Sequence, residues 1–501
     1  MYASIKTISF CGINVLDVDV QTQICNGLPS FSIVGLPDKT VAESRERIRA
    51  CLYAIGMQLP SKKIIVNLAP ADQPKEGSHY DLPIAISILS AMGLLRIQAD
   101  TEFYAMGELS LTGGIAKVHG VLPAAIHSLH KNSGLICPKD SESEAVWSSN
   151  PYILAANNLV EVITHFNETK TLAFSKVDEI TSQISKNTSQ NNILYPCMST
   201  VKGQRIAKRA LELAAIGGHN VMMSGPPGVG KSMMAAAFTG ILPPLSTEEI
   251  LEVTMIHSLA GKIPDSGLIT ARPLRAPHHS ASLVSVIGGG NRAQPGEISL
   301  AHKGVLFLDE MPEFSRNTLD ALRQPLENKE ITISRANHHI TYAADFQLIA
   351  AMNPCKCGYM GIFKKECKRA PSCGKEYLHR ISGPLLDRID IFLDINNISS
   401  HELLYDEAET SKTIQQRVIE SQKHQKSILG CKSILSNINT LQKHTDAKAL
   451  QFLTHSAEKI HMSARSYVRI LKLARTIADS EFCPIINDEH IAEAIGYRKV
   501  L

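Results

Sequence analysis

The sequence predicts an α/β fold built on a parallel sheet, and three short apolar runs are the evidence for it. Residues 219–224, 304–308 and 346–352 each have the length and composition of a buried strand. Continuous apolar runs of this kind are typical of parallel strands that helices cover on both faces. Glycine, acidic or amide residues follow each run. Because ligands of open parallel sheets bind at the carboxyl ends of the strands, we expect the functional site there.

The residues after the first of these strands match the phosphate-binding pattern G-x-x-x-x-G-K-[ST] without a mismatch. A helix-like stretch at 233–238 follows, which completes the strand, loop and helix that the motif requires. Backbone N–H groups of such a loop surround phosphates, and the start of the next helix adds partial positive charge. We therefore expect Lys231 to reach the β- and γ-phosphates of ATP and Ser232 to ligate Mg²⁺. The predicted loop consists of Gly225, Pro226, Pro227, Gly228, Val229, Gly230, Lys231 and Ser232.

Polar residues at the ends of the other two strands are candidates for ATP hydrolysis. Asp309 is expected to hold Mg²⁺ through water, and Glu310 to polarise the attacking water. Phosphoryl transfer depends mainly on positioning and charge neutralisation, so these groups are nearly sufficient. Asn353 is a candidate for orienting the water against the γ-phosphate. The alternatives are a solvated acidic turn after residue 308 and a plain turn residue before Pro354.

Composition describes a globular protein and excludes several classes. The 501 residues are 44% hydrophobic and 20% charged, and a formal net charge of +3 is too small to indicate nucleic-acid binding by itself. No run approaches the roughly 18 apolar residues of a membrane span, and the N-terminus does not resemble a signal peptide, so we expect a cytoplasmic protein without a membrane partner. Most of the eleven cysteines are scattered, as free thiols of a reducing compartment are.

Changes of composition predict three domains and a linker. The first domain has a β-branched run at 64–68 and a helix-like stretch at 41–53, which indicates α+β structure. The last alternates apolar and charged residues at helical spacing, as in Leu450, Leu453 and Ala457, then Val468, Leu471 and Ala474. The predicted boundaries are 1–165 for the first domain, 166–193 for a polar linker, 194–395 for the nucleotide-binding core and 396–501 for a helical domain.

In this order the motifs resemble those of the ComM/YifB family, bacterial AAA+ ATPases of the magnesium-chelatase-like branch. The resemblance covers nearly the whole chain. It implies an AAA+ P-loop core with a helical lid, preceded by a domain with the fold of the Lon protease domain. It also implies a hexameric ring that hydrolyses ATP and drives branch migration of DNA in homologous recombination, as when transforming DNA integrates. Its most specific blocks are residues 27–31, 33–38, 66–72, 275–279, 295–302 and 382–390.

The resemblance assigns roles to two arginines. Arg388 is similar to an arginine finger that stabilises the transition state on a neighbouring subunit. Arg465 resembles a second sensor that couples the lid to the nucleotide state. Without the resemblance, a local salt bridge to Asp387 or Asp390 is the simpler interpretation of Arg388, and a side chain that extends from a helix to solvent that of Arg465.

The Lon-like domain is not expected to be a protease. Residues 107–113 resemble a strand of the Lon domain, but Leu122 stands where the catalytic lysine would be. His79 stands at about the place of the catalytic serine, and Ser78 is one position early. Because a hydroxyl without its lysine base is not an activated nucleophile, we expect a scaffold for DNA binding or ring assembly.

A predicted hairpin supplies the candidate DNA contacts. Residues 330–335 and 340–342 alternate with period two around a polar turn. In the branch that the chain resembles, a hairpin just before the first sensor points into the pore of the ring and pushes on DNA. Arg335, His338 and His339 are therefore candidate DNA contacts, and a solvated hairpin tip is the alternative. Residues 288–292 form a second candidate pore loop, and His278 and His279 are given a structural or pore-proximal role.

Four cysteines are close in sequence: Cys355, Cys357, Cys367 and Cys373. Four thiolates in a short loop can enclose a structural Zn²⁺. The C-x-C spacing is tighter than the usual C-x-x-C, so a zinc site and reduced surface thiols remain alternatives.

Three functions agree with these features. The first is the hexameric DNA motor. The second is the motor subunit of a metal chelatase, in which a Lon-like N-terminal domain is not expected. The third is an AAA+ chaperone that remodels proteins. Stimulation of ATP hydrolysis by DNA, by a porphyrin partner or by protein distinguishes the three.

Overall fold

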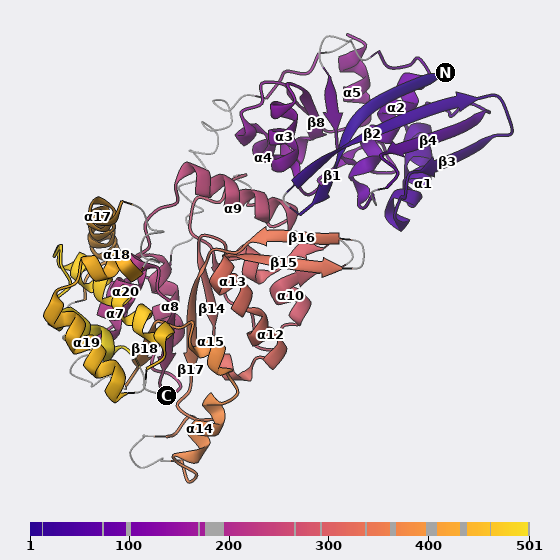
Figure 1. Ribbon diagram of the computed structural model, residues 1–501. Coiled ribbons are helices and arrows are strands. Elements are labelled where there is room, and N and C mark those ends of the chain that lie inside the picture. The colour runs from indigo at the N-terminus through magenta and orange to yellow at the C-terminus, as the bar shows by residue number, and fades with distance from the viewer. Residues whose placement is uncertain are drawn as a thin grey trace.

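A computed structural model shows two sheets, one in the N-terminal third and one in the middle of the chain, followed by a group of helices (Figure 1). Within the described residues no helix combines the length and the apolar character needed to cross a membrane. The structure describes residues 1–12, 14–72, 75–96, 102–168, 171–175, 195–264, 267–290, 293–335, 338–360, 367–396, 408–430, 438–460 and 462–498, so most of the predicted linker lies outside them.

The N-terminal sheet has seven strands in the order β3-β4-β2-β1-β5-β8-β9. β1 and β2 form a long antiparallel hairpin, and β2 is also antiparallel to β4, whereas the remaining neighbours are parallel. Parallel neighbours need crossover connections, so the sheet is a mixed one, as large sheets of α+β folds also are. The strands are β1 Tyr2–Cys11, β2 Asn14–Cys25, β3 Ser30–Val34, β4 Lys63–Ala69, β5 Phe103–Ala105, β8 Gly134–Pro138 and β9 Ile153–Ala156, with a small separate pair, β6 Glu108–Leu109 and β7 Ile115–Ala116.

Five helices pack with this sheet. The predicted strand at 64–68 and helix at 41–53 are confirmed as β4 and α1. On β4 the inward side chains alternate with partly exposed ones, and α2 is buried on nearly all sides. The helices are α1 Lys39–Ala54, α2 Asp81–Ala91, α3 Val121–His130, α4 Glu142–Ala145 and α5 Leu159–Phe166.

The second sheet has five strands in the order β11-β14-β17-β10-β18, and every neighbouring pair is parallel. The three apolar runs of the sequence form β10, β14 and β17, which confirms the prediction of a parallel α/β sheet. β10 lies between β17 and β18, so the loop after β10 follows a central strand. The strands are β10 Val221–Ser224, β11 Leu274–Arg275, β14 Val305–Leu308, β17 Gln347–Met352 and β18 Ile391–Asp394.

Helices cover both faces of this sheet. Side chains of β10, β17 and β18 that point to one face pack with α7, α8 and the C-terminal helices, and those on the other face pack with α12, α15 and the hairpin. A short pair, β12 Gly288–Gly289 and β13 Gln294–Pro295, follows α10; Asn291 and Arg292 of the second candidate pore loop lie outside the described residues. The helices are α7 Arg205–Gly217, α8 Lys231–Thr239, α9 Thr247–Leu259, α10 Leu283–Ile287, α11 Glu297–Leu300, α12 Arg316–Ala321, α13 Arg323–Asn328, α14 Ser372–Leu378 and α15 Gly383–Leu386.

The C-terminal segment is helical, as its spacing predicts. Leu453, Leu471 and Ala474 are fully buried and belong to the same core as β10 and α7. Side-chain caps from Thr410 and Ser463 start α17 and α20 by accepting backbone N–H groups three residues on. The helices are α17 Ser411–Leu429, α18 Ile438–Lys443, α19 Ala447–Lys459, α20 Ala464–Ser480 and α21 Asp488–Gly496.

The predicted hairpin is present as β15 Glu330–Arg335 and β16 His338–Ala343 (Figure 1). The pairing extends from Glu330↔Ala343 to Arg335↔His338. His338 and His339 therefore belong to β16, and the turn is shorter than the sequence indicates, because pairing continues through polar residues. The hairpin leaves α13 directly, so a movement of α13 would be transmitted to it.

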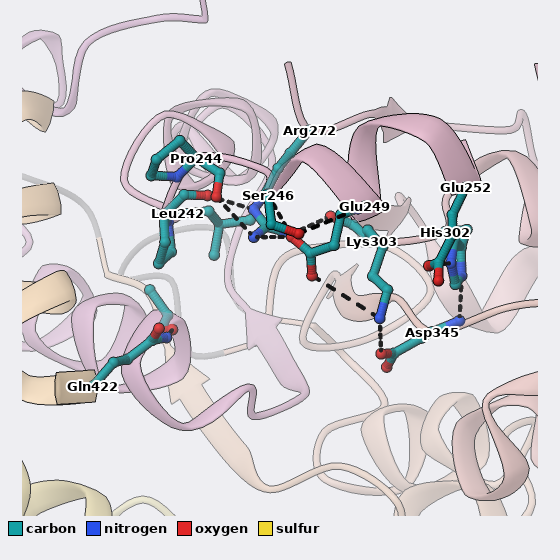
Figure 2. A network of polar contacts seen from close by, with 12 residues as sticks. Leu242, Pro244, Ser246, Glu249, Glu252, Arg272, His302, Lys303, Asp345 and Gln422 are labelled. Atoms are coloured by element: carbon teal, nitrogen blue, oxygen red, sulfur yellow. Dashed lines mark hydrogen bonds and ion pairs between the residues drawn. The ribbon is translucent and has the colours of Figure 1, made fainter. Parts of the chain in front are cut away.

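A polar network holds the amino-terminal edge of the sheet (Figure 2). Arg272 donates to the carbonyl oxygens of Pro243, at 2.5 Å, and Lys303, at 2.6 Å. Lys303 Nζ lies 3.0 Å from Asp345 Oδ2, and the Asp345 N–H donates to His302 Nδ1. The network joins the loop before α9 to the starts of β14 and β17, which fixes the strands whose other ends carry the candidate site.

Candidate nucleotide-binding site

The phosphate loop lies between β10 and α8, as predicted. Gly228 and Gly230 have φ angles of +83° and +89°, which only glycine adopts without strain. At Gly225 a Cβ atom would stand 2.4 Å from the carbonyl oxygen of Ile395, which follows β18. Glycine is thus required at three positions, and α8 begins at Lys231 with its free N–H groups at the loop.

Lys231 lies at the centre of the loop. Its Nζ donates to the carbonyl oxygens of Gly225, at 2.6 Å, and Pro226, at 2.9 Å, and to Asn353 Oδ1 at 3.2 Å. Burial lowers the pKa of Lys231, while Asp309 and Glu310 act in the opposite direction. The ammonium is therefore in contact with Asn353, the residue predicted to orient water.

The two other predicted groups meet beside the loop. Ser232 Oγ donates to Asp309 Oδ2 at 3.0 Å, although the two residues are far apart in sequence. A hydroxyl and a carboxylate at this distance are oxygen donors of the kind that Mg²⁺ prefers, so the pair fits the ion that the nucleotide would bring. Five predicted positions, Ser232, Lys231, Asp309, Glu310 and Asn353, come from the carboxyl ends of three adjacent strands.

Glu310 follows Asp309 in a strained conformation. Its φ angle is +50°, and its N–H donates to Asp309 Oδ1 at 3.0 Å. A non-glycine residue in this region costs of order 1 kcal/mol and is found mostly where surrounding structure or function requires it. The side chain is about half exposed, which leaves it free to meet water.

Sequence reasoning missed a neighbour of this carboxylate. His279 Nδ1 lies 3.6 Å from Glu310 Oε2, and the His278 ring stacks on His279 with 4.1 Å between centroids. A further role is therefore added to the structural or pore-proximal role predicted for His279: its ring can orient the carboxylate of Glu310. The loop that carries His279 follows β11, at the far side of β14, and only the folded sheet brings the two together.

Arg388 and Arg465 are brought together, but not with Lys231. Glu327 Oε1 accepts from Arg388 Nη2 at 2.6 Å and from Arg465 Nη2 at 2.9 Å. Arg388 is nearly buried and also donates to the carbonyl oxygen of Pro384, and the hydrogen bond from Arg388 lowers the pKa of Glu327. Glu327 is a second residue that sequence reasoning missed, because nothing near it in sequence indicates either arginine.

These arginines lie at the opposite edge of the sheet from the phosphate loop. Arg388 precedes β18, and Asn220, the residue before β10, donates to the Arg388 carbonyl oxygen at 3.0 Å. The loop follows the other end of β10, whose four residues span about 13 Å at 3.3 Å a residue. Arg388 and Arg465 therefore lie at the edge of the sheet opposite the phosphate loop of their own chain.

The four cysteines form a cluster that could hold a metal ion. Their sulfur atoms all lie within 4.8 Å of one another, and Cys355 Sγ is 3.1 Å from Cys357 Sγ. Cys355 and Cys373 are buried, and Cys357 is exposed. Four soft ligands at one point can coordinate a metal tetrahedrally, so the cluster has the geometry of a site as well as its composition.

The candidate DNA contacts are placed only by their backbone. Arg335 and His338 are the last paired residues before the turn of the hairpin, and His339 is paired with Ser334. Their side chains lie outside what the structure describes, so their contact with DNA stays a prediction.

Two of the positions compared with a protease, Ser78 and His79, line a cavity of about 630 Å³ that Leu259 and Tyr342 of the second half also line. His79 Nε2 is 3.0 Å from the carbonyl oxygen of Ile8. Leu122 is fully buried, and its N–H donates to Glu144. Residues of the second half of the chain thus share the lining of this cavity.

Comparison with known protein families matches three models along the chain. They are described as "Magnesium chelatase, subunit ChlI" at residues 197–403, "Subunit ChlI of Mg-chelatase" at 20–141 and "Magnesium chelatase, subunit ChlI C-terminal" at 408–498. Because the second model lies in the N-terminal part, that part does not by itself argue against a chelatase subunit, contrary to the expectation from the sequence.

Curated relatives match over nearly the whole chain. Competence protein ComM of Haemophilus influenzae is 41% identical over 497 residues, which are 98% of this chain and 96% of the relative. A protein of Escherichia coli named YifB and described as uncharacterized is 40% identical over 511 residues, 99% of this chain and 97% of that protein. The magnesium-chelatase 67 kDa subunit of Chlorobaculum tepidum is 28% identical over 158 residues, 31% of this chain and 23% of the subunit.

Proposed function

The chain belongs to the ComM/YifB family of magnesium-chelatase-like AAA+ proteins, and from this premise we propose that it is a DNA motor. In this proposal a hexameric ring hydrolyses ATP at its subunit interfaces and promotes branch migration of DNA. The process it serves is homologous recombination, including the integration of transforming DNA. The observation that carries the proposal is the convergence of Lys231, Ser232, Asp309 and Asn353 at one edge of a parallel sheet, with Arg388 at the other.

The proposed hydrolysis assigns each group one task. ATP enters with Mg²⁺, which neutralises phosphate charge when bound. Lys231 exchanges its carbonyl contacts for the β- and γ-phosphates, and Ser232 and Asp309 hold the ion. Glu310, oriented by His279, accepts hydrogen bonding from the attacking water, while Asn353 fixes that water in line. The protein contributes positioning and charge, which phosphoryl transfer mainly requires.

The position of Arg388 and Arg465 supports the proposed ring. If either acts on ATP, we propose that the ATP belongs to a neighbouring subunit, because both lie at the edge of the sheet opposite their own phosphate loop. The edge that carries them is rich in arginine: Arg469 pairs with Asp390, and Arg498 donates to the Ile389 carbonyl oxygen at 3.1 Å. Such an edge complements a neighbour's polyphosphate. Six copies are proposed by analogy with the family.

The hairpin is the proposed DNA-contacting element. Arg335, His338 and His339 stand beside its turn, and α13, which precedes the hairpin, carries Glu327. A neighbour's γ-phosphate that draws Arg388 or Arg465 away from Glu327 would free α13, and the hairpin would move with it. The name of the competence protein to which the chain is similar supports DNA as the partner.

Three further parts of the proposal have narrower support. The domain within residues 1–165 is proposed as a Lon-like, non-proteolytic scaffold, because Leu122 stands in place of the lysine and residues of the second half share the cavity at Ser78 and His79. We place the protein in the cytoplasm, where its ATP and DNA are. For the cysteine cluster, thiolate ligands favour Zn²⁺ over the oxygen-seeking Mg²⁺.

A chelatase motor is the second candidate, because all three matching family models carry that subunit's name. It predicts ATP hydrolysis that DNA leaves unchanged and a porphyrin-binding partner raises. A protein-remodelling chaperone predicts stimulation by polypeptide. Measuring hydrolysis with single-stranded DNA, a three-strand junction, a porphyrin partner and an unfolded protein separates the three.

Replacing the arginine beside the hairpin turn tests the DNA contact. Arg335→Ala is expected to weaken binding to single-stranded DNA and to reduce the slope of log affinity against log salt by about 1, because one phosphate contact is lost. Lys459→Ala, which removes an exposed charge at the end of α19, is the matched control and should leave the slope unchanged. Equal slopes for Arg335→Ala and wild type, in protein that still binds DNA, would remove the hairpin from the interface.

A further inference from the structure

A small lobe that runs from the end of β17 into α14, residues 354–376, lacks a hydrophobic core of its own in its described part, whereas Tyr377 and Ile381 after it belong to the core around the hairpin. Figure 1 shows α14 projecting away from the sheet. Among the described residues of 354–376, none belongs to a buried hydrophobic cluster. Apart from Gly358 and Gly374, the buried residues there are Cys355 and Cys373. A segment that buries so little apolar surface needs another source of stability, which in small folds is commonly a disulfide or a metal.

The backbone of the lobe presents the cysteines in pairs. The Cys355 carbonyl oxygen accepts from the Gly358 N–H at 2.9 Å, and the Cys367 carbonyl oxygen accepts from the Ala370 N–H at 3.0 Å. Two tight turns thus begin at a cysteine, and Gly358 has a φ angle of +78° that favours glycine. Cys357 lies inside the first turn. Cys373 is the second residue of α14.

The four sulfur atoms lie close enough to surround a single ion, although Cys355 Sγ and Cys357 Sγ, at 3.1 Å, are closer than in a bound tetrahedron. Four thiolates bound tetrahedrally at about 2.3 Å lie about 3.8 Å apart, and the four sulfur atoms here are all within 4.8 Å of one another. A cluster of iron and sulfide would hold its thiolates further apart. The side chains of Lys356 and Lys368 are exposed, and their positive charges would offset part of the negative charge of a metal bound to four thiolates, whereas Arg369 pairs with Glu376 at 2.8 Å.

The lobe touches the phosphate loop. A Cβ atom at Gly358 would stand 3.2 Å from Cδ of Pro227, so the first cysteine turn packs directly on the loop. The same segment begins two residues after Asn353, whose Oδ1 accepts from Lys231. Whatever fixes Cys355 and Cys357 therefore fixes both Pro227 and Asn353.

We propose that Cys355, Cys357, Cys367 and Cys373 bind one Zn²⁺, and that this ion braces the phosphate loop and Asn353. The second half of this inference rests on the proposed nucleotide site. The zinc has no part in the chemistry of ATP. It stabilises the lobe, whose described residues form no hydrophobic core of their own, and so holds the turn at Gly358 against Pro227.

Zinc content is measured first, on the full chain purified with a reducing agent. Wild type is expected to carry one zinc per chain, and Cys355→Ser and Cys373→Ser to lose it. Cys483→Ser is the control. Cys483 forms, with Glu481 and His490, another group that could hold a metal ion. Because His490 Nδ1 already accepts the Asn487 N–H, we expect no zinc there, so the Cys483→Ser variant should keep its one zinc per chain. Wild type with no zinc and four reactive thiols, or with a Cys355–Cys357 disulfide, would overturn the assignment.

The bracing role is measured on wild type, so that it does not depend on a variant that fails to fold. Removing zinc with a chelator is expected to weaken binding of a fluorescent ATP analogue about tenfold, the effect typical of lost supporting contacts, and restoring zinc should reverse it. Unchanged affinity after zinc loss would overturn the bracing role. Zinc-loaded wild type that binds no ATP at all would instead contradict the proposed nucleotide site and leave the zinc assignment supported.

Discussion

An Arg388→Ala variant is expected to hydrolyse ATP about a thousandfold more slowly than wild type, because the neighbour's γ-phosphate loses the charge that stabilises its transition state. ATP affinity should change little, since the phosphate loop lies at the other edge of the sheet. The fold should survive, because Glu327 keeps Arg465 as its partner and is itself half exposed. Steady-state hydrolysis and binding of a fluorescent nucleotide measure the two effects separately.

Mixing variants tests whether Arg388 acts between subunits. Lys231→Ala lacks ATP binding but keeps its arginine, whereas Arg388→Ala keeps its phosphate loop. In mixed rings some interfaces combine an intact loop with an intact Arg388, so the mixture is expected to regain hydrolysis that neither variant has alone. If the two variants assemble together but their mixture hydrolyses ATP no faster than either variant alone, action of Arg388 in trans would be contradicted. Arg388→Ala hydrolysing at the wild-type rate would remove its catalytic role.

A Glu310→Gln variant is expected to bind ATP as tightly as wild type and to hydrolyse it at least about a hundredfold more slowly, since the amide no longer polarises the attacking water. Nucleotide affinity and single-turnover hydrolysis are the measurements. Glu313→Gln is the matched control: it lies three residues on, pairs with Arg380 at 2.7 Å and should leave hydrolysis near wild type. Normal turnover by Glu310→Gln would show that another group orients the water.

The sequence predicts where the residues of the candidate nucleotide site meet, because its signals are local. The phosphate loop, the acids after β14 and Asn353 each directly follow a short apolar run, and parallel strands bring their carboxyl ends to one edge. The contacts of Lys231 with Asn353 and of Ser232 with Asp309 follow from that arrangement.

The partners that sequence reasoning missed are set by tertiary packing. His279 reaches Glu310 only because β11 lies beside β14, and Glu327 meets Arg388 and Arg465 only because α13, the end of α15 and the start of α20 come together. Neither contact leaves a periodic or spaced pattern in the chain. The hairpin turn was also misplaced, since backbone pairing extends through His338 and His339 regardless of their polarity.

The N-terminal part was predicted less completely. Strand and helix propensity located β4 and α1, but propensity does not show whether neighbouring strands run parallel, which depends on the crossover helices between them. The cysteine spacing left zinc and free thiols as alternatives. Folding adds the distances between the sulfur atoms, which spacing alone does not contain.

ATP-dependent branch migration on a labelled three-strand junction tests the central claim most directly, with wild type and Glu310→Gln compared at the same low salt. We predict product from wild type with ATP and none from Glu310→Gln, which still binds the nucleotide. No product from wild type, together with ATP hydrolysis that no DNA changes, would contradict a DNA motor.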